Sequence, residues 1–510
     1  MSEDTYDIII IGSGLGGLAA AATLSKEGYS VLVLEQYHKL GGFGQSYKIN
    51  DYIFDTAVHS VWFWEQIDEL LKTEFGISLD VVPSRRNDRI IIGDTCEFMA
   101  TSIPEMADQM KKIIPGESDN IQSYYDELIE SQAGFVDWVN NPSDLAAKLR
   151  MLKYKDLWRK TLEEAVDSKV RDPLAKSLLY GYHDSYLYDY SWSYPAHHLY
   201  LTKYLYDGYQ PVGGSQPLVD AFVYASEKYG AEFQTNSLVV KILTEGNEAK
   251  GVLLDDGRKI EAGTAVISNA DGILTYEKLI GIEKLTSKMK NELKTWKRFA
   301  PSLSYYILNV GIDIDVEKVY GLKGDLTVYY PQNEVLKCLK TINAGVLGDD
   351  FWLWAVFPSV NDKTLAPPGH SVGVLSVLVP YDIENSSHAS GAYNFDGLKA
   401  ENTKGADYYK FKEVITKRIL DRADEIFPGL SKHIVVKDLI TPQTIEHTTL
   451  NHKGSTLEID KLHLVGGWTE DGFSVPSVLT SGREVAFEIS GKTGYRISAD
   501  VNHRMERLRK

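Results

Sequence analysis

The 510-residue sequence predicts an α/β fold, in which a βαβ unit at the start of the chain is completed by distant segments and interrupted by an inserted α+β region. Three observations predict it. An apolar, β-branched run from Asp7 to Gly12 leads through a glycine-rich turn into the Ala- and Leu-rich stretch Leu18 to Lys26. Similar strand and glycine patterns return at residues 231–271 and 462–486. The chain is also long for a single core, so we expect more than one domain.

Composition and charge exclude several classes of protein. The net charge of −17 disfavours nucleic acid as a partner. Cys96 and Cys338 have no metal-ligand spacing, so we expect neither a disulfide framework nor a metal site, and a cytoplasmic location. The first apolar run is broken by glycines and lacks a basic flank, so it predicts neither a signal peptide nor a membrane span. Peripheral contact with the inner face of a membrane stays open.

The first βαβ unit carries the spacing G-x-G-x-x-G at Gly12, Gly14 and Gly17. These glycines allow a tight turn, a close approach of backbone to pyrophosphate and close packing of helix on strand. The following helix would direct its free N–H groups at the phosphates. A second strand, Tyr29 to Leu34, ends at Glu35, whose carboxylate can accept ribose hydroxyls. The unit therefore predicts a bound dinucleotide.

A second glycine pair, Gly41 and Gly42, follows the acid within the stretch that starts at Gln36. This stretch resembles the extension found in flavin proteins of the amine-oxidase and phytoene-desaturase superfamily, which implies FAD as the cofactor. Many members carry an Arg beside the pair, whereas this chain has Phe43 and Gln45 in that neighbourhood.

Three later segments extend the resemblance. Residues 52–59 resemble the "FDTG-H" segment of retinol saturases and carotenoid isomerases, with Ala57 in place of the usual glycine. Residues 210–218 match the family element "P-x-G-G-x-x-x-L", although a plain turn before a helix would look the same. Residues 462–486 resemble the C-terminal signature "L-x-L-V-G-x-x-T-x-x-G…P…SG-x-x-A", whose helix directs its positive end at the flavin.

Between these segments, residues 231–242, 251–254 and 265–271 predict three strands of a small sheet, with a hairpin-like turn at Asp255–Gly257. In the resembling family, the residue that matches Val239 meets the adenine through its backbone. The segment that matches Ser268–Asp271 returns beside the nucleotide.

Together these segments resemble the phytoene desaturase, carotenoid isomerase and all-trans-retinol saturase family. The resemblance implies a discontinuous, Rossmann-like FAD-binding domain of the amine-oxidase/phytoene-desaturase type, formed by residues 1–65, 210–275 and 438–510. It implies a substrate domain of antiparallel sheet plus helices at residues 66–209 and 276–437. The implied cofactor contacts are Gly12, Gly14, Leu15, Gly16, Gly17, Glu35, Gln36, Gly41, Gly42, Gln45, Ser46, His59, Val239, Asn269, Ala270, Asp271, Gly467, Trp468, Val475 and Pro476.

The inserted region has two parts. From Trp64 to Tyr209 the pattern is helical, around residues 106–114, 121–139 and 145–164. Strand-like runs at residues 302–310, 351–356 and 372–379 predict an antiparallel sheet that walls a substrate cavity. The stretch 441–460 is shorter and less glycine-rich than the family version. We therefore expect part of the cavity wall to differ from that of the family. No second G-x-G-x-x-G follows a strand, so we expect no built-in NAD(P)H domain.

Two further tracts each allow two interpretations. Residues 178–194 are rich in Tyr, which suits a flat, conjugated ligand or an ordinary aromatic core. Residues 148–160 combine six Lys or Arg with Leu, Met, Tyr and Trp, which suits an anionic lipid surface or a solvated helix face.

Four side chains are candidates for acid–base work beside a flavin: His59, Glu470, Asp471 and Tyr209. A histidine after a strand often only bonds the backbone, and paired acids in a loop are often solvated. A structural role is therefore the alternative for each.

The leading hypothesis is an FAD-dependent oxidoreductase or isomerase that acts on carbon–carbon bonds of a hydrophobic polyene or isoprenoid-like substrate. An external electron acceptor or donor, such as a quinone, oxygen or a reductase, would complete the cycle. The second hypothesis is a soluble amine- or amino-acid-oxidase-like flavoenzyme, since the fold hosts that chemistry too. The third is a non-catalytic prenyl-escort protein of the GDP-dissociation-inhibitor type, against which the complete phosphate loop with Glu35 argues.

Overall fold

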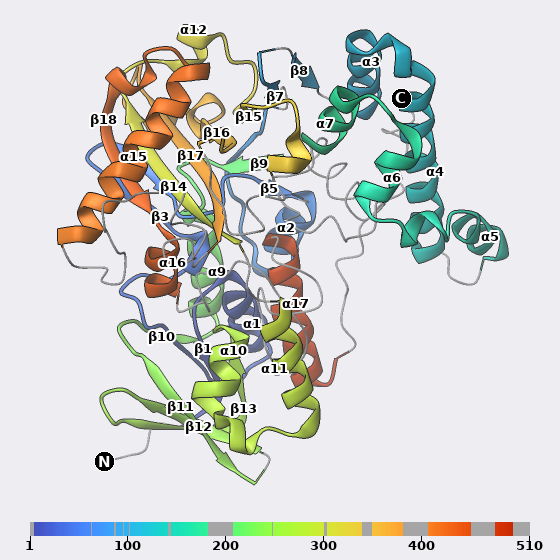
Figure 1. The fold of residues 1–510 in the computed structure, drawn as a ribbon. Coiled ribbons are helices and arrows are strands. Elements are labelled where there is room, and N and C mark those ends of the chain that lie inside the picture. Colours follow the sequence, from blue (N-terminus) through green and yellow to red (C-terminus); the bar gives the residue numbers. More distant parts are fainter. Residues whose placement is uncertain are drawn as a thin grey trace.

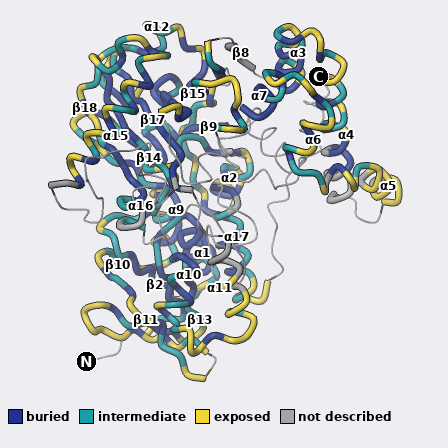
Figure 2. Tube along the Cα trace, viewed as in Figure 1, coloured by how far each residue is buried: buried dark blue, intermediate teal, exposed yellow. Residues whose placement is uncertain are grey.

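The computed structural model describes residues 5–492, with longer gaps at 182–207, 339–348, 381–405 and 450–474 and shorter ones at 63, 86–87, 95, 101, 141–143, 247 and 300–302 (Figure 1). Two large sheets organise the described residues, one of six strands and one of seven. Figure 2 shows buried residues along the strands of both sheets and exposed residues concentrated on outer turns and on one helical lobe.

The six-stranded sheet is formed by segments distant in sequence, in the order β10-β2-β1-β13-β12-β11. Strand β1 pairs in parallel with β2 and β13, which confirms the predicted βαβ unit. The predicted small sheet is part of this larger one, and its first run splits into two strands at opposite edges. The strands are β1 (Thr5–Ile11), β2 (Val31–Leu34), β10 (Glu232–Gln234), β11 (Val239–Glu245), β12 (Glu248–Leu254) and β13 (Lys259–Ser268).

Helix α1 (Leu15–Lys26) joins β1 to β2 and is buried along almost its whole length. It packs against α9 (Gln216–Lys228) and α17 (Val475–Ser490), so the C-terminal helix lies beside the first helix of the chain (Figure 1). A Cβ at Gly482 would stand 2.1 Å from the carbonyl oxygen of Gly16. Only a residue without a side chain allows this approach of the two helices.

The seven-stranded sheet has the order β18-β14-β17-β16-β15-β7-β8, and its pairs are antiparallel except for β7 with β15. The strand runs predicted at residues 302–310, 351–356 and 372–379 are confirmed within it. Helix α15 (Ala406–Ile426) packs on one face through an apolar stripe. The strands are β7 (Asp88–Ile92), β8 (Cys96–Ala100), β14 (Leu303–Ile312), β15 (Leu326–Tyr330), β16 (Leu353–Val356), β17 (Ser371–Pro380) and β18 (Ile434–Ile440).

A helical lobe packs on the other face of β7 and β15 and contributes its own core. Thr161 caps α6 with a reciprocal bond to Glu164, which starts a new helix, so the helical stretch predicted at residues 145–164 is interrupted. Within the stretch from Trp64 to Tyr209, which the sequence predicts to be mostly helical, the β-branched runs near residues 81 and 90 form strands. The lobe helices are α3 (Ile103–Ile113), α4 (Ser118–Asn140), α5 (Leu145–Lys153), α6 (Leu162–Lys169) and α7 (Pro173–Gly181).

Short elements connect the two sheets. The hairpin β3 (Ser46–Ile49) and β4 (Tyr52–Asp55) packs on β14, where a Cβ at Gly311 would lie 2.8 Å from the Tyr52 ring. A three-stranded sheet has the order β5-β9-β6. The remaining elements are β5 (Val61–Trp62), β6 (Val81–Pro83), β9 (Gly208–Pro211), α2 (Trp64–Leu70), α10 (Gly272–Leu274), α11 (Ser287–Phe299), α12 (Val316–Tyr320), α16 (Pro442–Thr449) and π-helical turns at Leu71–Phe75 and Thr275–Gly281.

None of the helices in the described residues combines the length and apolar character needed to cross a bilayer. The Tyr-rich tract continues past α7 into residues 182–194, which lie outside the described residues.

Candidate functional site

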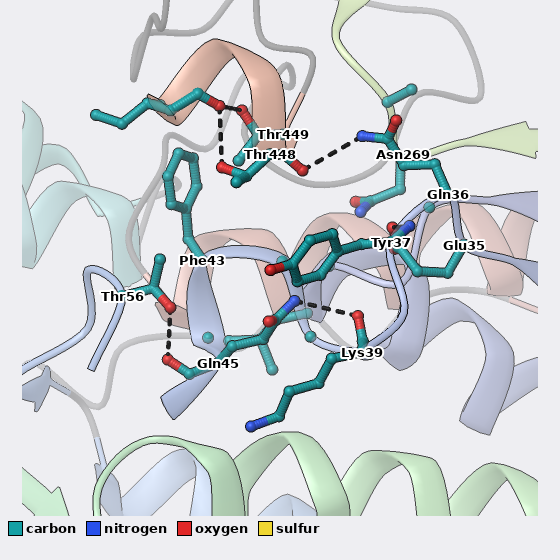
Figure 3. Close-up of a pocket in the computed structure, with 18 of the residues that line it drawn as sticks. Glu35, Gln36, Tyr37, Lys39, Phe43, Gln45, Thr56, Asn269, Thr448 and Thr449 are labelled. Carbon is teal, nitrogen blue, oxygen red and sulfur yellow. Dashed lines mark hydrogen bonds between the residues drawn. The ribbon is translucent and has the colours of Figure 1, made fainter. Parts of the chain in front are cut away.

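A cavity of about 480 Å³ runs along the carboxyl ends of β1 and β2 and reaches the seven-stranded sheet at β18 (Figure 3). Both the glycine loop and the second glycine pair line it. Thirteen of the predicted cofactor contacts belong to its wall: Gly12, Gly14, Leu15, Gly16, Glu35, Gln36, Gly41, Gly42, Gln45, Val239, Asn269, Ala270 and Val475.

The glycine motif before α1 and the second glycine pair contact each other in the cavity wall. Gly14 and Gly41 form an isolated β-bridge, and a Cβ at Gly42 would lie 3.2 Å from the Gly14 Cα. A Cβ at Gly14 would stand 2.5 Å from the amide nitrogen of Asn269. Gly12, Gly41 and Gly42 all have positive φ, which glycine adopts without strain. The bare backbone therefore forms a cradle that any side chain would fill.

Helix α1 begins in this cradle. Its N-cap is Gly14, and no side chain caps its first turn. The first N–H groups of the helix are consequently available to a ligand, and the helix dipole favours an anionic group there.

Glu35 is buried at the end of β2. Its Oε2 accepts from the backbone N–H of Ser13 at 2.9 Å and from the Ser13 hydroxyl at 2.6 Å, and its Oε1 accepts from Tyr37 N–H at 2.9 Å. The Ser13 hydroxyl also accepts from Gly41 N–H at 3.1 Å. Sequence reasoning missed Ser13; a small polar residue at the first variable position of the glycine motif was the available signal.

These donors and acceptors fit a dinucleotide that carries a ribose and a pyrophosphate. The free helix N-terminus suits the phosphates, and Glu35 keeps lone pairs for ribose hydroxyls. Ser237, Leu238 and Val239 line the cavity beside that carboxylate, and Ser237 N–H donates to the Glu35 carbonyl at 2.9 Å. The backbone at the start of β11, through which the resemblance implies an adenine contact, therefore lines the cavity.

Helix α16 forms a wall that the sequence did not predict. Thr444, Ile445, Thr448 and Thr449 line the cavity, and the Thr448 carbonyl accepts from Gln36 Nε2 at 3.3 Å. Figure 3 shows the Phe43 side chain between Thr56 and this helix. Where many members of the resembling superfamily carry an Arg, this chain has an apolar ring in the cavity wall.

Ser46 does not line the cavity but fixes the loop that does. Its hydroxyl donates to Asp55 Oδ1 at 2.6 Å, and the same oxygen accepts from the backbone N–H and hydroxyl of Ser215 at 2.8 and 2.9 Å. A Cβ at Gly214 would lie 2.7 Å from that oxygen. The glycine element at residues 210–218 is therefore joined through the buried Asp55 carboxylate to the loop that ends at Ser46.

His59 lies next to this carboxylate and outside the cavity wall. Its Nδ1 is 3.9 Å from Asp55 Oδ2, too far for a hydrogen bond, and that buried nitrogen has no hydrogen-bond partner in the described part of the chain. Tyr209, on β9, packs on an apolar cluster beneath α9 and is likewise absent from the wall.

The remaining predicted residues have structural positions or are not described. Gly17 lies against the loop, since its Cβ would stand 2.4 Å from the Gly12 carbonyl oxygen. Asp271 caps α10 by accepting from Leu274 N–H at 2.7 Å, and Pro476 is the second residue of α17. Gly467, Trp468, Glu470 and Asp471 lie outside the described residues. In the described part of the chain, no group of three or more His, Cys, Asp and Glu could hold a metal ion.

Electrostatics at the loop are modest. Lys39 lines the cavity and donates to the Ser46 carbonyl, and burial lowers its pKa while Asp220 partly offsets this. The side chain therefore ties the start of this loop to Ser46 at its end.

Comparison with known proteins agrees with this architecture. Residues 10–72 match a family model described as an NAD(P)-binding Rossmann-like domain. The chain is 24% identical to 4,4'-diaponeurosporene oxygenase of Staphylococcus aureus strain MSSA476, over 96% of this chain and 99% of the relative.

Two solved structures share the fold. An oxidoreductase from Methanosarcina mazei aligns with a TM-score of 0.62 at 16% identity, covering 95% of this chain and all of the other. A wild-type putrescine oxidase bound to putrescine aligns with a TM-score of 0.61 at 15% identity, covering 96% and 99%.

The fold therefore defines the class: a protein that contains a Rossmann-like domain near its start and has the overall fold of this oxidoreductase and this oxidase. Within that class, the chain is similar over nearly its full length to an enzyme named for a carotenoid substrate, which confirms the predicted resemblance.

Proposed function

We propose that this chain is an FAD-dependent oxidoreductase or isomerase that acts on carbon–carbon bonds of a hydrophobic, polyene-like substrate. One observation carries the proposal: a single cavity joins the glycine cradle and Glu35 to the antiparallel sheet at β18. Such a cavity brings a dinucleotide and an apolar substrate into one site. The full-length similarity to a carotenoid enzyme supports the substrate class.

The residues of this chain would bind, orient and exclude water. The N-terminus of α1, the glycine motif before it and the Gly41–Gly42 pair would hold the pyrophosphate. Glu35 would bind a ribose. The FAD, when bound, supplies hydride exchange at its flavin ring. Phe43, Val58 and Ile440 give the cavity wall apolar surface, which keeps water from the reacting carbons.

The test is anaerobic incubation of the purified, flavin-loaded protein with polyenes, using oxidised and reduced protein separately, followed by mass and isomer analysis. Loss of two hydrogens indicates desaturation, gain of two indicates saturation, and an isomer change at constant mass indicates isomerisation. A parallel incubation in air reports oxygen insertion. If no polyene changes in any arm, the proposal fails.

The two alternatives give different results in the same preparation. Peroxide released with an amine would favour an amine-oxidase-like enzyme. A colourless protein without extractable flavin would favour a non-catalytic escort. Reoxidation of the reduced protein by oxygen, a quinone or a reductase would identify the class of electron partner.

We also propose that α5 contacts an anionic membrane surface from the cytoplasmic side. Leu145, Leu149 and Leu152 are 68%, 59% and 42% exposed and share one helical face. The helix projects from the lobe with exposed residues along it (Figure 2). The six Lys and Arg of residues 148–160 contrast with the chain's net charge of −17, so this segment complements anionic lipid.

A further inference from the structure

Four polar side chains form a cluster where the cavity meets the seven-stranded sheet. Tyr47 on β3 and Asp438 on β18 both line the cavity. The Tyr47 hydroxyl donates to Asp438 Oδ2 at 3.0 Å and accepts from Asn309 Nδ2 at 2.7 Å. Lys412 Nζ on α15 lies 3.8 Å from Asp438 Oδ1. The dinucleotide contacts assigned above include none of these four residues.

The surroundings of Tyr47 keep its hydroxyl protonated. Burial, reinforced by the Asp438 charge, raises the pKa of Tyr47 well above its ordinary value. The phenol therefore keeps its proton and directs it at the carboxylate. Asn309 is fully buried, and its side-chain oxygen has no hydrogen-bond partner among the residues that the structure describes. The cluster thus has more hydrogen-bond acceptors than donors, because the Tyr47 hydroxyl proton is already bonded to Asp438.

This imbalance selects among ligand groups. A hydroxyl can donate to the Asp438 carboxylate, which accepts several hydrogen bonds. A carbonyl oxygen, which only accepts hydrogen bonds, would instead face the Asp438 carboxylate and the Tyr47 hydroxyl, whose proton already bonds that carboxylate. Lys412 already offsets the charge of Asp438, so a neutral donor suits the site better than a second cation. The rest of the nearby wall includes the apolar side chains Val58 and Ile440.

We propose that Tyr47 and Asp438 bind a hydroxyl group carried by the hydrophobic substrate. The pair would thereby select an alcohol over the hydrocarbon or aldehyde with the same chain. This inference rests on the function proposed above and deepens it by naming a polar group on the substrate. Asn309 acts as a positioning residue, because it holds the Tyr47 hydroxyl at the edge of the cavity.

The test is an anaerobic binding titration of the flavin-loaded protein with four ligands that share one polyene chain: the hydrocarbon, the primary alcohol, the aldehyde and the primary amine. Flavin absorbance reports binding. The wild-type protein is expected to bind the alcohol about tenfold more tightly than the hydrocarbon and to gain nothing from the aldehyde. Tyr47→Phe and Asp438→Asn are expected to lose the preference for the alcohol while the Kd of the hydrocarbon stays unchanged.

Tyr329→Phe is the matched control. Tyr329 lies on β15 of the same sheet, and its hydroxyl also donates to a carboxylate, Glu425 on α15, at 3.1 Å, but Tyr329 does not line the cavity. This variant is expected to keep the wild-type preference. Flavin content and thermal unfolding report the folding of each variant, and Asp438→Asn carries the test if Tyr47→Phe loses its flavin.

Three results would overturn the inference: equal binding of alcohol and hydrocarbon by the wild type, a preference retained in both variants, or tightest binding of the amine. Failure of this inference alone leaves binding of the polyene hydrocarbon intact. If no ligand of the series binds to the flavin-loaded protein, the proposed function fails as well, so the two failures are distinguishable.

Discussion

Ser13 joins two parts of the site that are far apart in sequence. Its hydroxyl donates to Glu35 and accepts from the N–H of Gly41, and the side chain is fully buried. Loss of this hydroxyl would leave a buried N–H without its acceptor and a carboxylate with one donor fewer. Buried groups that lose a partner bear the full cost of desolvation.

Ser13→Ala is therefore expected to lower the free energy of unfolding by about 1–3 kcal/mol and to reduce the amount of bound flavin. Urea denaturation and the flavin-to-protein ratio measure these effects. Ser118→Ala is the control, because its exposed hydroxyl bonds only a nearby carbonyl. Equal behaviour of the two variants would contradict the role given to Ser13.

At this scale the sequence predicts residues whose function follows from local backbone, and it misses those that act through distant partners. The glycines and Glu35 lie within one βαβ unit whose mechanics are known. Tyr47 acquires its role only because Asn309 and Asp438 come from two other strands. No spacing of residues along the chain predicts that these three side chains come together.

Among the helices and strands, Glu74 in the turn after α2 connects two helices of the nucleotide domain. It accepts from Lys26 at the end of α1, and Arg483 on α17 lies 3.9 Å away. The hydrogen bond from Lys26 is the largest cause that lowers the pKa of Glu74 below its ordinary 4.5. The folded state therefore favours the ionised carboxylate.

Because its pKa is depressed on folding, Glu74 contributes stability above pH 4.5, and this contribution is lost as the pH falls through the lower, folded-state pKa. Glu74→Gln is expected to lower Tm at pH 7 and to have a smaller effect at acid pH. The side chain is 42% exposed, so we expect less than about 1 kcal/mol. An equal loss of Tm at both pH values would contradict this reasoning.

Helix α5 gives the second prediction at this scale. Leu149→Asp is expected to reduce sedimentation with phosphatidylglycerol vesicles several-fold, because it places a charge in the exposed apolar stripe. Wild-type protein is expected to sediment weakly with neutral phosphatidylcholine vesicles. Val319→Asp, which changes an exposed apolar residue on α12, should bind as the wild type does. Unchanged binding of Leu149→Asp would argue against α5 as the contact.

Most elements of the two sheets could be predicted from local pattern, including the strands near residues 303, 353 and 371. The short strands β7 and β8 could not, because a short apolar run looks alike in a helix and in a strand. They become strands by pairing with β15 and with each other. Helix α16 lies in the stretch 441–460, which the sequence already marks as shorter and less glycine-rich than the family version, so the resemblance gave no basis for predicting this part of the cavity wall.

For the whole molecule, the contact of α17 with α1 closes the nucleotide domain. Gly482→Ala would set a Cβ against the rigid backbone of Gly16 and force the helices apart. We expect a loss of about 1–3 kcal/mol in the free energy of unfolding, together with a loss of bound flavin. Chemical denaturation measures the first and absorbance the second. Gly263→Ala is the control, since its Cβ would meet only ordinary contacts at 3.7 Å and beyond.

The same contact can form only late in the synthesis of the protein. The first βαβ unit leaves the ribosome early, yet the helix that packs on it is translated only after the whole seven-stranded sheet. At roughly 5–20 residues per second, the early unit waits on the order of tens of seconds for its partner. During that time the face of α1 that α17 will cover is exposed to other apolar surfaces. The nascent chain is therefore expected to depend on chaperones until α17 has been synthesised.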